Sequence, residues 1–112
     1  MITSMFDAVK SLKKGSVVAL RLLLEAGGDA NLANQDGTTP MLIAAQEGKL
    51  ETLHLLLQAG GNPNKARQKD GATPVLIAVQ EGKLDALILL LDGGGEPNKA
   101  DEDGSTPLLF AI

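Results

Sequence analysis

The fold is decided by the stretch Asp36–Asn64, DGTTPMLIAAQEGKLETLHLLLQAGGNPN, because the chain repeats it. A close copy, DGATPVLIAVQEGKLDALILLLDGGGEPN, spans Asp70–Asn98, and a third begins at Asp103 as DGSTPLLFAI. A more divergent copy precedes them and ends at Asn31. Equivalent residues of successive copies are 33 or 34 positions apart. A period of this length is typical of proteins built from stacked repeats.

Each copy is predicted to fold as a turn, a short helix, a turn, a second helix and a loop. Thr39 can cap a helix whose first residue is Pro40, where the missing N–H of proline costs nothing. Gly48 can end that helix in the left-handed conformation. A second helix is predicted from about Leu50 to Ala59. The glycine pair and the Asn-Pro-Asn sequence that follow it predict a loop leading to the next Asp-Gly turn.

This pattern resembles the ankyrin repeat over residues 5 to 112. The shared positions in the second copy are Gly37, Thr39, Pro40, Ala44, Ala45, Gly48, Leu55, Leu56, Leu57, Gly60 and Asn64. The resemblance implies an all-α ankyrin-repeat solenoid of stacked helix-turn-helix units with short β-hairpin or turn fingers. One difference is consistent: Leu42, Leu76 and Leu109 stand where the family usually has histidine. We therefore expect a drier seam between the repeats.

The chain is predicted to form a single domain of three repeats and a partial fourth. The first unit is expected to cap the N-terminal end of the stack, with a helix that begins at Ser4. A terminal repeat has one face in water, which suits the polar side chains of this copy. The units are residues 1–33, 34–66, 67–100 and 101–112.

One finger differs from the others in length. The segment between the second and third units carries one extra residue, within Arg67–Lys69. We expect the insertion to lengthen this finger and to place Arg67 and Lys69 at an exposed edge. Neutral drift in a loop that tolerates insertions is the alternative explanation.

Composition excludes several classes of function. The chain has ten basic and fourteen acidic residues, a net charge of −4, which argues against a nucleic-acid partner. It contains no cysteine, so disulfides, thiol catalysis and thiolate metal sites are not available. No apolar run is long enough to predict a membrane-spanning helix. We expect an intracellular, cytoplasmic protein.

The sequence predicts no catalytic, cofactor or metal site. His54 is the only histidine, and we align it with Arg21 and Leu87 of the other units, which predicts a solvated position. The acidic segment 101–104 resembles part of a calcium loop, but Lys99 stands where a ligand is needed. An enzyme needs converging acid, base or nucleophilic groups, and none is apparent.

The resemblance implies that the concave face binds another protein. That face consists of the finger tips and the exposed sides of the first helices. Carried over residue by residue, it comprises Lys13, Lys14, Gln35, Asp36, Thr38, Gln46, Glu47, Lys69, Asp70, Ala72, Gln80, Glu81, Glu102, Asp103 and Ser105. Because most of its charges are acidic, we expect a partner with a basic patch. A stable polar groove without a strong partner is the alternative, since no aromatic anchor is present.

The partial fourth unit offers residues for a first helix only. Its apolar side chains predict an exposed edge, and such edges mark interfaces. Two explanations stay open: the chain is a piece of a longer ankyrin scaffold, or it forms a homo-oligomer through Leu108, Leu109, Phe110 and Ile112. A third functional alternative is an inhibitor or regulator that blocks a partner enzyme.

Overall fold

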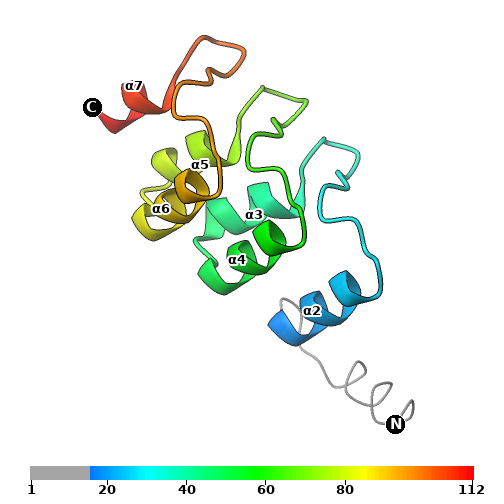
Figure 1. Ribbon diagram of the computed structural model, residues 1–112. Helices are drawn as coiled ribbons and strands as arrows, with labels where there is room; N and C mark the ends of the chain where they lie inside the picture. Colours follow the sequence, from blue (N-terminus) through cyan, green and yellow to red (C-terminus); the bar gives the residue numbers. More distant parts are fainter. Residues whose placement is uncertain (1–15) are drawn as a thin grey trace, which may run out of the picture.

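Residues 16–112, the part of the chain that the computed structural model describes, form a stack of short helices joined by loops (Figure 1). The stack is 51 Å along its longest axis. Lys13, Lys14 and the helix predicted from Ser4 lie outside the described residues. The helices are α2 (Val17–Glu25), α3 (Pro40–Glu47), α4 (Leu50–Gln58), α5 (Pro74–Gln80), α6 (Leu84–Asp92) and α7 (Pro107–Ala111).

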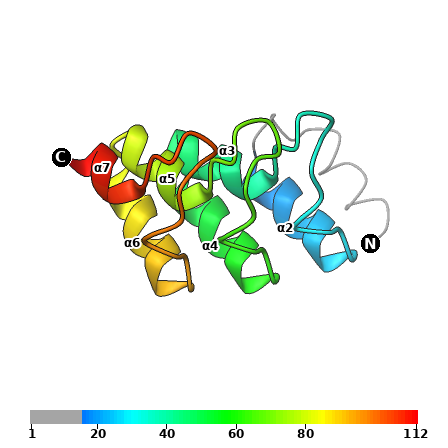
Figure 2. The same ribbon diagram turned by 90° about the horizontal axis from the view of Figure 1, so that it is seen from above.

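The helices form two rows. In Figure 2 the first helices of the repeats, α3, α5 and α7, form the upper row, and the second helices, α2, α4 and α6, form the lower row. Each helix contacts its counterparts in the neighbouring repeats, and no strand occurs among residues 16–112. The fingers between the rows are therefore turns rather than paired strands. This arrangement confirms the predicted all-α solenoid.

The first helices begin as the sequence predicts. The side-chain oxygens of Thr39, Thr73 and Thr106 accept hydrogen bonds of 3.2, 3.2 and 3.3 Å from the backbone N–H three residues on. Each is followed by proline at the first helical position. Gly48 ends α3 with φ 67°, in the left-handed region that glycine adopts without strain. These local signals fix where each repeat turns into its helix.

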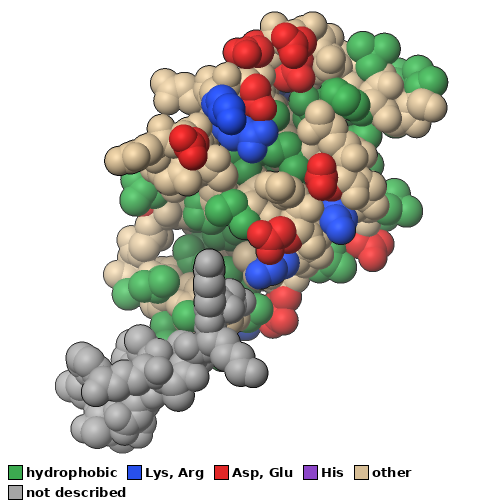
Figure 3. Space-filling model, turned by 180° about the vertical axis from the view of Figure 1, so that it is seen from behind, with side chains coloured by type: hydrophobic (Ala, Val, Ile, Leu, Met, Phe, Trp, Pro, Cys, Tyr) green, Lys and Arg blue, Asp and Glu red, His purple; other side chains and the backbone are tan. Residues whose placement is uncertain are grey.

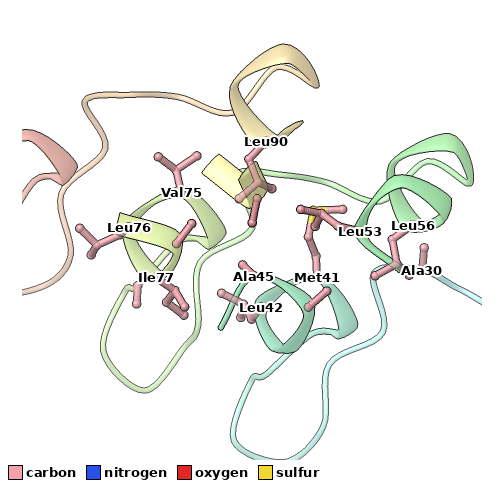
Figure 4. Packing of buried hydrophobic residues seen from close by; sticks show 14 residues of the cluster. Ala30, Met41, Leu42, Ala45, Leu53, Leu56, Val75, Leu76, Ile77 and Leu90 are labelled. Atoms are coloured by element: carbon pink, nitrogen blue, oxygen red, sulfur yellow. The ribbon is translucent and has the colours of Figure 1, made fainter. Parts of the chain in front are cut away.

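The core runs through the stack as one cluster of aliphatic side chains (Figure 4). Leu42 and Leu76, which replace the usual histidine, are both fully buried between repeats. No buried side-chain nitrogen or oxygen in the described part of the chain lacks a partner. At these two positions the seam between repeats therefore carries a buried apolar side chain. Leu109 has the same place in α7 but is 61% exposed, because no described element covers it.

Hydrogen bonds also join each loop to the loop before it. The Asn31 side chain donates to the Gly60 carbonyl at 3.1 Å and accepts the Asn62 N–H at 2.6 Å. The Lys65 ammonium donates to the Asn31 carbonyl at 2.8 Å. The same set recurs one repeat later, at 2.7–3.1 Å, between Asn64 and Gly94, Glu96 and Lys99. These loop bonds are not among the features predicted from the sequence.

Candidate functional site

The finger of each repeat is the turn before its first helix: residues 34–38, 67–72 and 101–105 for the first, second and third fingers. The first and third fingers are each closed by a short polar side chain. Asn34 Oδ1 accepts two backbone N–H groups, from Asp36 and Thr38, both at 3.0 Å. Asp101 plays the same part in the third finger, with bonds of 2.9 Å from Asp103 and Ser105. Side chains of this type stabilise tight turns because they replace a backbone partner. The tips of these two fingers are thus held in a defined shape.

The second finger, which carries the insertion, is closed differently. Arg67 occupies the place of Asn34 and has no side-chain acceptor to offer. Instead Asp70 accepts the Ala72 N–H at 3.1 Å and both Nε and Nη2 of Arg67, at 3.1 and 2.7 Å. A two-point contact between guanidinium and carboxylate has a fixed geometry. The pair therefore substitutes for the closure used in the other fingers.

This pairing corrects one expectation. Arg67 is not at an exposed edge: its side chain is only 25% exposed, because it turns back onto Asp70. Lys69 is exposed, as predicted. The Arg67 hydrogen bond lowers the pKa of Asp70 below its ordinary value of 3.8 and the same bond raises the pKa of Arg67.

The substitution Asp70→Asn should lower the free energy of unfolding at neutral pH by about 0.2–1 kcal/mol. The effect is small because 38% of the Asp70 side chain is exposed and solvent screens the pair. A lowered pKa in the folded state stabilises above the unfolded value and is lost as pH falls through the folded value. The difference from wild type in urea unfolding should therefore shrink below pH 3.8. An undiminished difference at low pH would show that the ion pair is not its cause.

The three fingers pack against one another in a row. A Cβ atom added at Gly37 would lie 2.7 Å from the Gln68 Cβ atom, and one at Gly71 would lie 2.9 Å from the Glu102 nitrogen. The Glu102 N–H also donates to the Asp70 carbonyl at 3.0 Å. Such close contacts require glycine at both positions and make the finger tips one continuous surface.

Ala72 does not belong to that surface. It was expected at a finger tip, but it is 3% exposed and lies in the core. Its carbonyl accepts the Arg67 N–H at 2.8 Å, which places it at the base of the second finger. Thr38 and Ser105, at the matching positions, are half-buried for the same reason. The other predicted finger residues, Gln35, Asp36, Glu102 and Asp103, are exposed.

The predicted helix residues, Gln46, Glu47, Gln80 and Glu81, are all exposed. Glu47 forms an ion pair of 3.4 Å with Lys49, whereas Glu81 has no ion-pair partner among residues 16–112. Acidic side chains also gather on the third finger, at the top of Figure 3. The unpaired negative charge of this surface is therefore concentrated at its C-terminal end.

The described residues offer no other chemistry of the kind that marks a site. His54 is exposed, and its structural counterpart in α6 is Ile88 rather than Leu87, because the inserted residue shifts the alignment by one. No three His, Cys, Asp or Glu side chains within residues 16–112 lie close enough to hold a metal ion. No helix in the same range is long and apolar enough to cross a membrane.

Comparison with known families agrees with the geometry. A family model described as ankyrin repeats (3 copies) matches residues 5–67 and 43–112, which together cover almost the whole chain. Comparison with curated proteins finds no matching sequence. Ankyrin repeats are in general protein-interaction modules and are typically not enzymes. On the repeat geometry and the family match together, the chain belongs to the ankyrin-repeat family.

Proposed function

We propose that this chain is a non-enzymatic module that binds another protein through its finger tips and the ends of its first helices. The observation that carries the proposal is the continuous finger row, in which glycine contacts hold three tips in fixed register. A surface ordered before binding loses little conformational entropy when a partner docks on it. The binding residues are Gln35, Asp36, Thr38, Gln46, Glu47, Lys69, Asp70, Gln80, Glu81, Glu102, Asp103 and Ser105, with Lys13 and Lys14 proposed from the resemblance alone.

The charges of this surface indicate where a partner would dock. Asp70 and Glu47 are paired within the chain, to Arg67 and Lys49. Four acidic residues of this surface are exposed and have no such pair among the described residues: Asp36, Glu81, Glu102 and Asp103. Three of the four lie on the third finger or at the end of α5. An unpaired carboxylate attracts a cationic group more strongly than one that is already neutralised. We therefore expect the partner's basic patch to face the third finger and the end of α5.

The triple change Glu81→Lys, Glu102→Lys and Asp103→Lys should weaken capture of the partner from a lysate by about tenfold or more. Reversed charges would repel a basic patch, and wild-type binding should weaken as salt rises. The measurement is quantitative mass spectrometry of proteins retained by each bait, followed by titration of the captured protein.

A matched control carries the same charge change away from the fingers. Asp85→Lys, Asp92→Lys and Glu96→Lys alter three exposed acidic residues of α6 and the loop after it. This control should retain the partner. If both variants lose it equally, net charge rather than the finger surface decides binding, and the proposed site is wrong.

A second candidate function is assembly, either as part of a longer scaffold or with other copies of the chain. The exposed apolar end of α7 favours it, since Leu108, Leu109, Phe110 and Ile112 are all exposed.

A regulator of a partner enzyme would use the same finger surface as the first proposal. Only the activity of the captured partner, measured with and without this chain, separates those two functions.

A further inference from the structure

The three fingers differ in the charge that they carry at the tip. Each has an aspartate directly before its glycine: Asp36, Asp70 and Asp103. In the first and third fingers this aspartate is exposed and has no ion-pair partner among the described residues. In the second finger both carboxylate oxygens of Asp70 accept hydrogen bonds from the Arg67 guanidinium, at 3.1 and 2.7 Å. The middle finger therefore lacks the free negative charge of its neighbours.

A cation is exposed on the second finger instead. The extra residue of this finger lies within Arg67–Lys69, and Lys69 is exposed beside Asp70. Lys69 has no ion-pair partner within residues 16–112. The residues in the same place before the aspartate are Gln35 in the first finger and Glu102 in the third. In Figure 3 blue side chains accordingly lie between red ones along the finger row.

Contacts with both neighbouring fingers hold this cation in place. A Cβ atom added at Gly37 of the first finger would lie 2.7 Å from the Gln68 Cβ atom. The Asp70 carbonyl of the second finger accepts the Glu102 N–H of the third finger at 3.0 Å. Lys69 stands between Gln68 and Asp70, the two residues that make these contacts. Its positive charge is therefore fixed between two negatively charged tips.

The ion pair inside the second finger keeps Lys69 free. The hydrogen bond from Arg67 is the largest cause of the lowered pKa of Asp70, and the charge of Lys69 lowers it further. The two side chains are thus close enough to interact, but the carboxylate is already bound in two-point geometry by the guanidinium. Without Arg67, Asp70 could pair with Lys69 and neutralise it.

We propose that the finger row binds a partner surface in which an acidic side chain, facing Lys69, lies between basic side chains that face the first and third fingers. This inference rests on the proposed function and specifies its partner more closely than a basic patch does. A carboxylate is attracted by a free ammonium group, whereas a second cation opposite Lys69 would be repelled. The third finger also carries Asp101 and Glu102, so we expect the stronger basic flank there.

The role of Lys69 is to discriminate between basic partners. A surface with several free carboxylates attracts any polycation, and specificity then requires an element that repels the wrong ones. Lys69 is such an element, because a uniformly basic partner would place a cation against it. A single exposed ion pair is weak, so the discrimination should be about two- to fivefold in the dissociation constant.

The test uses two synthetic peptides of identical composition, so that their net charges are equal. In the first peptide a block of glutamates lies between two blocks of lysines, and in the second the same glutamates lie at one end. Fluorescence anisotropy at low ionic strength measures the binding of each to the 112-residue chain. The first peptide should bind about two- to fivefold more tightly than the second.

Single variants assign this preference to one side chain. Lys69→Glu should abolish or reverse it, because the central glutamates would then face a carboxylate. Arg21→Glu makes the same charge change at an exposed cation of α2, away from the fingers, and should keep the preference. Circular dichroism of both variants confirms that the fold is intact. A preference that survives Lys69→Glu would overturn the assignment of Lys69.

The triple variant Glu81→Lys, Glu102→Lys and Asp103→Lys separates this inference from the proposed function. It should bind neither peptide. If it loses both while the wild-type chain binds the two peptides equally, the finger surface binds basic partners and only the role of Lys69 is wrong. If it retains both peptides as tightly as the wild-type chain, or if the wild-type chain binds neither, the finger surface is not a site for charged partners and both proposals fail.

Discussion

Replacement of Leu76 by alanine lowers the free energy of unfolding by about 2–5 kcal/mol, since the change removes buried methyl groups and leaves a cavity. Leu76 has no exposed surface and lies in α5, which packs against α3, α6 and α7. In a stack whose repeats contact only their neighbours, a defect at the middle weakens the interfaces on both sides. Urea unfolding followed by circular dichroism measures the loss.

The same substitution at Leu109 is the matched control. Leu109 has the same place in its repeat, but 61% of it is exposed, so Leu109→Ala should change the free energy of unfolding by about 0.5 kcal/mol or less. The comparison is made at low protein concentration, so that contacts between copies cannot cover Leu109. Equal losses from the two variants would mean that burial at the seam does not determine stability.

Gly95→Ala should be the second strongly destabilising change, at about 1–3 kcal/mol. The added Cβ atom would lie 2.7 Å from Val75 Cγ2 and 2.8 Å from the Leu90 carbonyl oxygen. That oxygen already accepts the Gly95 N–H at 2.8 Å, so the loop cannot move away without losing this bond. Val75 is β-branched and has little rotamer freedom to yield. The decrease in the midpoint temperature of thermal unfolding measures this loss of stability.

A double variant tests the cause. Val75→Ala alone leaves a cavity beside Gly95, and the new methyl group of Gly95→Ala would partly fill it. The decreases in the free energy of unfolding of the two single variants should therefore sum to more than the decrease in the double variant. The Leu90 contact remains, so rescue is incomplete. Strict additivity would show that the Val75 contact is not the source of the strain.

The sequence predicts the repeat and its helix boundaries well because these depend on local chemistry. A threonine cap, a proline at the first helical position and a glycine at the end act within a few residues of each other. Thr39, Pro40 and Gly48 take the predicted roles, and α4 ends one residue before the predicted Ala59. Repetition of the same signals then places α5 and α7.

Burial of the site residues could not be predicted in the same way, because it depends on what lies in the next repeat. Leu76 and Leu109 occupy the same motif position, yet one is buried and the other is exposed. Ala72 aligns with the finger-tip positions of the repeat but lies in the core, and the Arg67 side chain pairs with Asp70 instead of extending into solvent. The loop bonds, by contrast, could have been predicted. Lys65 and Lys99 recur at equivalent positions, directly after Asn64 and Asn98, and such a recurrence indicates a shared structural role.

The uneven burial along the stack has a mechanical consequence. The helix α2 contains no buried residue, whereas α4 and α6 each bury two. A force that pulls the two ends apart acts equally on every interface, because the repeats are connected in series. The interface with the least burial yields first, so α2 detaches from α4 before α4 detaches from α6. Under tension, residues 16–112 would therefore extend in steps, and α2 would be released before α4.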